Sequence, residues 1–149
     1  MSYNDLRKGR WSEPGREYLV TTVTKRRAPF FLNLKLSRLF IGELIRLECE
    51  GSCSWLAWVL MPDHFHGLLS LGSGVDLSKV MKHLKARSAR AIQQQRGVTG
   101  SLWETGFHDR ALRKEEQRLP VARYIIANPL RAGLVERIGD YPHWDRIWL

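Results

Sequence analysis

The stretch Trp58-Val-Leu-Met-Pro-Asp-His-Phe-His-Gly-Leu-Leu-Ser-Leu71 is the most informative part of the chain. Its apolar first half is interrupted at Met61-Pro62-Asp63, and a period-two pattern then begins at His64, which predicts two strands in a hairpin or one bent strand. Alternate side chains of a strand share a face. His64 and His66 therefore project together, and Phe65 points to the opposite face, which we expect to be core.

These two histidines could hold one divalent cation, because imidazole is the commonest side-chain ligand for metals. The alternative is a surface position or a structural hydrogen bond, since most histidines bind no metal. The pair alone favours that alternative. The metal interpretation therefore depends on residues elsewhere in the chain.

The length of the chain, 149 residues, predicts one domain with a hydrophobic core of its own. No repeat, long linker or low-complexity run divides residues 1–149. We expect a polar N-terminal arm over about residues 1–16 and an aromatic tail over about residues 139–149 that packs as an extended segment. Cys49 and Cys53 are expected to be free thiols near a helix-to-strand connection.

The charge balance is strongly basic. Lys and Arg number 24 against 15 Asp and Glu, which gives a net charge of +9 and a pI of about 10.1. Such an excess favours a polyanionic partner bound through phosphate contacts. A charge that serves solubility and an anionic membrane surface are the alternatives. No apolar run is long enough to cross a bilayer and no signal segment follows the basic N-terminus, so we expect a cytoplasmic protein.

Periodicity and turn residues predict the other elements. They are a strand over 18–24, a helix from 34 to about 48, strands over 55–60 and 64–71, a helix capped by Asp76 or Ser78 that runs to about 95, a short strand over about 107–111, and a helix from about 114 to 127 that Pro129 stops at Asn128. This order is typical of an α+β ferredoxin-like sandwich, in which helices cover one face of an antiparallel sheet. An additional C-terminal helix is left over.

The helix that ends near residue 95 has a basic side opposite its apolar side. The basic residues are Lys79, Lys82, Lys85, Arg87 and Arg90. A solvated helix surface and a surface that binds a nucleic-acid backbone are the two interpretations. The absence of acidic residues between Lys79 and Arg96 favours nucleic acid.

The C-terminal helix carries Tyr124 and Asn128, which share a helix face because they are four residues apart. The amide oxygen of Asn128 could join two imidazoles on a divalent cation that Tyr124 faces. A half-buried tyrosine and a helix-terminal asparagine are the alternative, which the spacing alone favours.

Three segments resemble one family when taken together. They are Trp58–Leu69, Gly106-Phe-His-Asp-Arg-Ala-Leu112 and Tyr124-Ile-Ile-Ala-Asn-Pro-Leu-Arg-Ala-Gly-Leu-Val135. In this order they are similar to the REP-associated tyrosine transposases, which are relatives of single-tyrosine HUH transposases. The opening Pro14-Gly15 and the strand over 18–24 also resemble the start of that family, so the likeness covers nearly the whole chain.

The resemblance implies a metal-dependent single-stranded DNA endonuclease and strand transferase. In that family His64 and His66 would be ligands of Mg²⁺ or Mn²⁺, and Tyr124 would be the nucleophile that forms a 5′-phosphotyrosine link. Related insertion-sequence transposases have a glutamine where this chain has Asn128, which keeps the carbonyl donor and shortens its reach. The expected location is the bacterial cytoplasm, at the nucleoid when DNA is bound.

The resemblance also implies a substrate, single-stranded DNA with REP hairpins. The candidates for phosphate contacts are Lys25, Arg26, Arg27, Lys82, Lys85, Arg87 and Arg90, and Trp11 or Trp103 could stack on bases. A non-catalytic protein that binds REP hairpins, and a hydrolase that uses activated water, are the competing hypotheses. Monomer and dimer both stay open.

Overall fold

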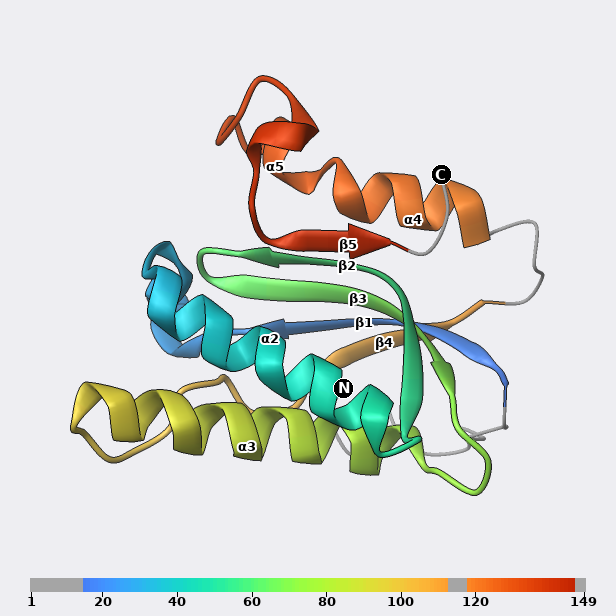
Figure 1. The fold of residues 1–149 in the computed structure, drawn as a ribbon, viewed down its shortest axis with the longest axis horizontal. Helices are drawn as coiled ribbons and strands as arrows, with labels where there is room; N and C mark the ends of the chain where they lie inside the picture. The colour runs from blue at the N-terminus through green and yellow to red at the C-terminus, as the bar shows by residue number, and fades with distance from the viewer. Residues whose placement is uncertain (1–14, 113–117, 147–149) are drawn as a thin grey trace.

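The computed structural model describes residues 15–112 and 118–146 (Figure 1). Its strands are β1 (Glu17–Val23), β2 (Cys53–Met61), β3 (His64–Leu71), β4 (His108–Ala111) and β5 (Trp144–Arg146). Its α-helices are α2 (Leu34–Cys49), α3 (Leu77–Arg96), α4 (Arg118–Ile126) and α5 (Asn128–Arg131). Short 3-10 turns are η1 (Lys25–Arg27), η2 (Phe30–Leu32) and η4 (Ile138–Asp140).

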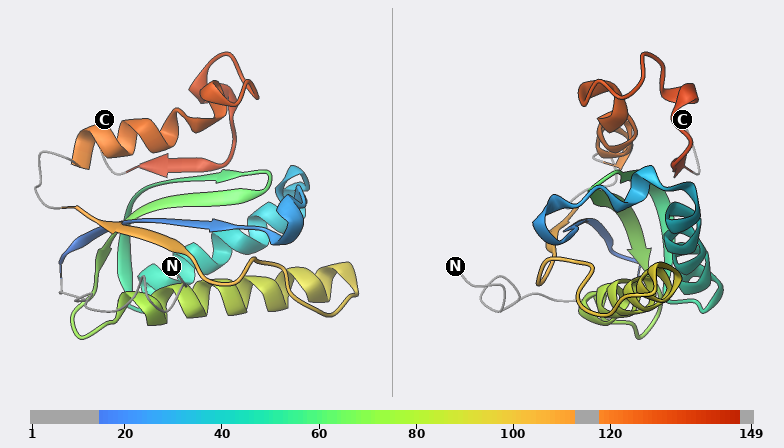
Figure 2. Two further views of the ribbon diagram at one scale, coloured as in Figure 1. Left: turned by 180° about the vertical axis from the view of Figure 1, so that it is seen from behind. Right: turned by 90° about the vertical axis from the view of Figure 1, so that its left-hand side faces the viewer.

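The five strands form one sheet in the order β4-β1-β3-β2-β5, and every neighbouring pair is antiparallel. The helices α2 and α3 lie together on one side of this sheet, and α4 lies on the other (Figures 1 and 2). The prediction of an α+β sandwich with an antiparallel sheet is therefore confirmed. The leftover C-terminal helix covers the face that α2 and α3 leave open.

The central stretch is a hairpin rather than one bent strand. In this hairpin β2 pairs with β3 from Met61 opposite His64 to Cys53 opposite Leu71. Pro62 and Asp63 make the turn, and Thr24 binds it because both its amide and its hydroxyl donate to the Asp63 carbonyl at 3.0 Å. The turn therefore sits beside the end of β1.

The α2–α3 face of the sheet carries the larger core. Phe65 is fully buried there, with its ring centroid 4.9 Å from that of Phe40 on α2 and 5.6 Å from that of Trp55 on β2. Leu69 and Leu71 follow Phe65 into the same core at period two. The expectation that Phe65 marks a core face is confirmed.

A second core lies on the opposite face, where α4 packs. Ala122, Ile125 and Ile126 of this helix are buried against Val59 and Leu68 of the central hairpin. Each strand of the hairpin therefore contributes apolar side chains to both faces, which is why its sequence reads as a nearly continuous apolar run.

The helix ends follow capping rules. The side chain of Asn33 accepts from the Leu36 amide at the start of α2, and that of Asp76 accepts from the Ser78 amide at the start of α3. Asp76 is thus the N-cap of α3, and Gly97 ends that helix with φ 70°. The predicted stop before Pro129 is observed, but a one-turn helix, α5, follows immediately because proline suits a first helical turn.

Within the predicted aromatic tail, residues 144–146 are extended as the strand β5, which pairs with the edge of β2, whereas residues 147–149 lie outside the described residues. The hydroxyl of Tyr141 donates to the Leu60 carbonyl at 2.5 Å, and the Leu60 amide donates to the His143 carbonyl at 2.9 Å. Burial raises the pKa of Tyr141 to about 12, so the hydroxyl remains a donor.

Both cysteines are free thiols, Cys49 exposed at the end of α2 and Cys53 buried at the start of β2. None of the helices in residues 15–112 and 118–146 is long and apolar enough to cross a membrane.

Candidate functional site

The two histidines of β3 lie side by side on the face that α4 covers. Phe65 between them points into the α2–α3 core, and Leu68, which shares their face, packs in the α4 core. The ring centroids of His64 and His66 are 4.7 Å apart, with planes inclined at 79°. The alternation predicted from the sequence therefore brings the two imidazoles together.

Each imidazole is oriented by a hydrogen bond at its Nδ1 atom. His64 Nδ1 lies 2.7 Å from Asp63 Oδ1, and His66 Nδ1 lies 2.8 Å from the hydroxyl of Thr21. Thr21 stands directly opposite His66 in the β1–β3 register. Within the described residues no hydrogen bond engages either Nε2 atom. Fixing one ring nitrogen and leaving the other open is how proteins prepare histidine as a metal ligand.

Asp63 connects the histidines to the basic turn η1. Its second carboxylate oxygen accepts from Arg27 Nε at 3.0 Å. Burial raises the pKa of Asp63, but hydrogen bonds from His64 and Arg27, together with their charges, outweigh burial and lower it. Asp63 is therefore ionised at neutral pH and can hold the His64 ring.

His66 is held in its neutral form. Burial lowers its pKa to about 4, helped by the charges of His64, Arg131 and Arg27. A neutral imidazole presents a lone pair, which a divalent cation requires. The electrostatics of this face therefore suit a metal ligand.

Tyr124 projects from α4 with 64% of its surface exposed. The guanidinium carbon of Arg131 lies 3.7 Å from the centroid of the Tyr124 ring, a close cation–π contact. The positive charge of Arg131 also helps to lower the pKa of His66. Arg131 therefore contacts the tyrosine ring and also contributes to the electrostatics of the histidine.

Asn128 is the first residue of α5 and is half-buried. In residues 15–112 and 118–146 no group of three or more His, Cys, Asp or Glu side chains is placed to hold a metal ion. A cation on His64 and His66 would therefore need a ligand of another type, such as the Asn128 amide, water or the substrate.

The basic residues selected from the sequence form two groups, one at the end of β1 and one on α3. The first, Lys25–Arg27, is the exposed turn η1 beside the histidines, where Arg26 and Arg27 have positive φ of 55° and 52°. The second group lies on α3. Lys82 and Arg90 are exposed there.

The expected basic outer side of α3 is only partly solvated. Lys85 Nζ donates to the Glu104 carbonyl at 2.7 Å and to the Gly106 carbonyl, and burial lowers the pKa of Lys85 although Glu104 opposes that shift. Arg87 pairs with Glu50, the residue that follows the C-terminal end of α2. Both cations therefore bind within the protein.

Trp103 does not serve as an exposed base-stacking platform. It is 6% exposed, packs in the α2–α3 core, and donates from its indole to the Ser88 hydroxyl at 3.0 Å. That interpretation is wrong, because the loop before β4 folds inward over α3. Trp11 lies outside the described residues.

Four residues of the site were missed in the sequence. Asp63 and Arg131 stand inside quoted motifs, but only the folded chain shows what they contact. Thr21 and His108 are recognisable only from register, because Thr21 pairs with His66 on one side and with His108 on the other. His108 is exposed and shares the face of the histidine pair.

The fold and this arrangement define a class, a small α+β domain with a histidine pair on the sheet face that a tyrosine-bearing helix covers. The family model described as "Transposase IS200 like" matches residues 15–128, and the chain belongs to that family of DNA-processing enzymes. The predicted resemblance to REP-associated tyrosine transposases is confirmed by a relative of that description from Escherichia coli K12. It is 28% identical over 100 residues, which are 66% of this chain and 58% of that protein, so the chain spans little more than half its length.

Solved structures agree on the fold. A REP-associated tyrosine transposase bound to a REP hairpin superposes with a TM-score of 0.77 at 21% identity, over 91% of this chain and 79% of that chain. A protein of Deinococcus radiodurans described as a transposase has a TM-score of 0.57 at 24% identity, over 80% of this chain and 95% of that chain.

Proposed function

We propose that this chain cleaves and rejoins single-stranded DNA that carries REP hairpins, with Tyr124 as the nucleophile. The observation that supports it best is the contact of Arg131 with Tyr124 on the face of the sheet that holds the histidine pair. The relative of known structure bound to a REP hairpin supports the choice of substrate. The protein's excess of positive charge suits the same ligand.

His64, His66 and the Asn128 amide are the residues that would hold Mg²⁺ or Mn²⁺. The hydrogen bonds at both Nδ1 atoms and the neutral state of His66 support this assignment. A cation bound there would polarise the scissile phosphate and stabilise the charge that develops on it.

The covalent step is a transesterification. The phenolic oxygen of Tyr124 forms a bond to phosphorus as its proton leaves, and the bond from phosphorus to the 3′ oxygen breaks. The departing oxygen takes up a proton and becomes a 3′-OH, while the 5′ side stays linked to the tyrosine. Because one phosphodiester replaces another, a 3′-OH can reverse the step without an external energy source.

Arg131 and Arg27 would both serve this step. The stack of Arg131 on the Tyr124 ring limits the positions of an otherwise exposed side chain, which keeps the phenol near the phosphate. The Arg27 guanidinium is held by Asp63, which also binds His64. Guanidinium groups bind phosphate oxygens in a paired geometry.

The test is covalent trapping. Purified protein incubated with Mn²⁺ and a single-stranded REP hairpin oligonucleotide should give a protein–DNA adduct that survives denaturing electrophoresis, and Tyr124→Phe should abolish it. Because Tyr124 is largely exposed, the variant should melt at the same temperature as the parent protein.

The same experiment separates the competing hypotheses. An adduct that persists in Tyr124→Phe would refute the nucleophile assignment. Cleaved DNA without an adduct would indicate a hydrolase that uses water, and tight binding without cleavage in any divalent metal would indicate a binding protein.

A further inference from the structure

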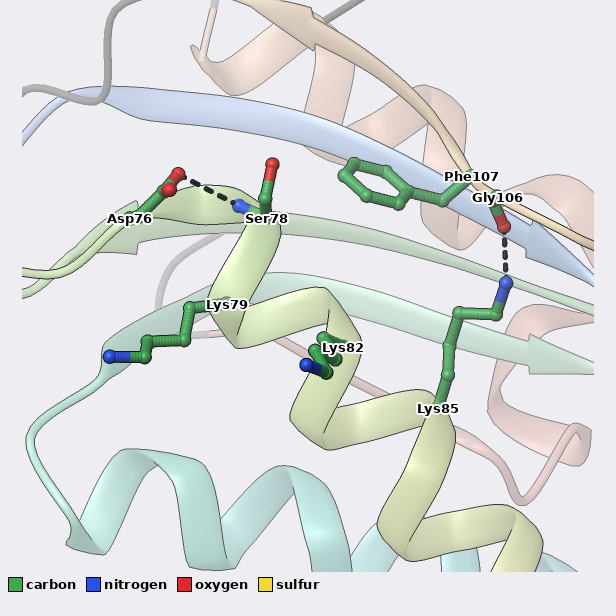
Figure 3. Close-up of a pocket in the computed structure, with 7 residues that line it drawn as sticks. All are labelled: Asp76, Ser78, Lys79, Lys82, Lys85, Gly106 and Phe107. Atoms are coloured by element: carbon green, nitrogen blue, oxygen red, sulfur yellow. Dashed lines mark hydrogen bonds between the residues drawn. The ribbon is translucent and has the colours of Figure 1, made fainter. Parts of the chain in front are cut away.

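A second candidate site is a cavity on the α3 side of the sheet, away from the face of the histidine pair. It has a volume of about 530 Å³ and lies between the N-terminal half of α3 and the loop that enters β4 (Figure 3). Its described lining residues are Asp76, Ser78, Lys79, Lys82, Lys85, Gly106 and Phe107. The volume falls in the range of roughly 300–1,000 Å³ typical of small-ligand sites.

Three lysines make one wall of the cavity positive. Lys79, Lys82 and Lys85 follow one another at helical spacing along α3, and all three line the cavity. Their side chains fan out from the helix, with Lys79 extending to the left and Lys85 reaching the Gly106 carbonyl (Figure 3). Lys79 and Lys82 are exposed, and Asp76 stands at the helix start, where it caps the Ser78 amide. The cavity therefore has a cationic middle and a carboxylate at one end, which suits a ligand with one phosphate rather than several.

Lys85 has a different task from its two neighbours. Its ammonium group donates to the carbonyls of Glu104 and Gly106, and thereby fixes the loop before Phe107. The Phe107 ring lines the cavity opposite Ser78 (Figure 3). Because the ring is only 7% exposed and belongs to the α2–α3 core, it offers the cavity an apolar edge and not a free stacking face. Aromatic rings also pair edge to face, so this edge can contact the face of a nucleobase.

The loop anchored by Lys85 also contacts the basic turn beside the histidines. The Arg26 amide donates to the Glu104 side chain at 2.8 Å, and the Lys25 amide donates to the Leu102 carbonyl at 2.9 Å. Arg27, the next residue, pairs with Asp63 and through it with His64. Hydrogen bonds, an ion pair and adjacent residues of η1 therefore connect the histidine pair, around the end of β1, to the loop that borders the cavity.

We propose that this cavity holds one unpaired nucleotide of the DNA strand, with its phosphate on Lys79 and Lys82 and its base against Phe107. The ligand class rests on the proposed function, since the cavity by itself selects a phosphate beside a flat apolar group. Turn η1 and the loop over residues 102–106 guide the strand between the two sites. The cavity thus binds a nucleotide that lies outside the cleavage centre.

Binding should be measured without cleavage, in Tyr124→Phe protein with EDTA, by fluorescence anisotropy of a fluorescein-labelled single-stranded 20-mer. Lys79→Gln and Lys82→Gln should each weaken binding several-fold and lower the slope of log K against log salt by about 0.7, the value for one phosphate contact on a single strand. The matched control is Lys35→Gln, which removes one exposed lysine from α2. Its net charge is therefore the same as that of the Lys79→Gln and Lys82→Gln variants. It should change neither quantity.

The base is located by photocrosslinking a strand that contains 5-iododeoxyuridine. A crosslink to Phe107 in the peptide over residues 97–110 would support the proposal. Crosslinks confined to other segments, an equal loss of affinity in Lys35→Gln, or an equal loss on a duplex of the same sequence would overturn it. Neither readout depends on attachment of the DNA through Tyr124, so a failure of the cleavage proposal would be seen separately.

Discussion

The two faces of strand β3 differ in what surrounds adjacent residues. Phe65 is fully buried among aromatic rings on the α2–α3 face. His66, one position later, is held by the Thr21 hydroxyl and lies in the field of Arg27 and Arg131 on the α4 face. One strand therefore serves packing on one face and chemistry on the other, because its side chains alternate.

This difference means that stability and activity can be altered separately at neighbouring positions. The packed face excludes water and depends on shape, so truncation there costs free energy of unfolding. The histidine face depends on hydrogen bonds and charge, and Tyr124 at its margin is largely exposed. Substitutions at positions 65 and 67 should therefore change mainly the stability, and substitutions at position 66 mainly the activity.

The largest effect on stability is expected for Phe65→Ala. Removing a fully buried ring should cost about 3–5 kcal/mol and lower the melting temperature by roughly 10 °C or more. Thermal unfolding followed by circular dichroism measures both. Phe65→Leu should lose clearly less, and a loss below about 1 kcal/mol in Phe65→Ala would contradict the assignment of this face as the principal core.

His66→Ala should reduce activity strongly and stability only slightly. We expect adduct formation with Mn²⁺ to fall by about 100-fold or more, since altering even the groups that orient a metal ligand costs 10–100-fold. The stability cost should be about 1 kcal/mol, for the lost Thr21 hydrogen bond. His83→Ala on α3 is the control and should leave adduct formation unchanged. Equal activity in the two variants would exclude His66 from the site.

Gly67→Ala tests the packed face from behind the histidine pair. A Cβ atom on Gly67 would lie 2.7 Å from both Phe65 and Trp55 ring atoms, which have no room to move. We expect a loss of about 1–3 kcal/mol from overpacking. Gly42→Ala is the control, because a Cβ there meets nothing within 4 Å and alanine favours the helix interior by roughly 0.5–1 kcal/mol. A gain of stability in Gly67→Ala would show that the aromatic pair can yield.

The smallest effect is expected for Arg131, at the margin of the histidine face. Loss of the cation–π contact in Arg131→Gln should slow adduct formation by about 3–30-fold, and Arg131→Lys should recover part of the loss by keeping the charge. Single-turnover rates at saturating DNA measure this. Identical rates in both variants and the parent protein would show that Tyr124 needs no positioning by Arg131.

Most of the fold could be predicted because its elements are long and periodic. The helices α2 and α3 and the strands of the central hairpin lie close to their predicted bounds. The strand β5 has three residues and the helix α5 has four, too few to show a period, and β5 exists because β2 offers it an edge. The prediction of an extended tail holds for residues 144–146, but it did not include their pairing with β2.

The site was less predictable in its contacts than in its residues. Lys85 and Arg87 belong to the basic side of α3 by helical spacing, yet the loop over residues 102–106 and Glu50 engage them. Trp103 was a candidate for base stacking in the sequence, but the same loop places it in the core. Helical and strand periods describe one element at a time and cannot show which other element arrives beside it.

The sequence by itself determined the alternation of β3, the excess of positive charge and the motifs that place this chain among IS200-like transposases. Tertiary structure decided what each motif residue contacts. Thr21 and His66 are 45 positions apart, and the charge of Arg131 on α5 helps to lower the pKa of His66 on β3. Such contacts depend on register and packing between distant segments, which no local pattern specifies. The histidine pair is a local property of one strand, whereas its surroundings are a property of the whole fold.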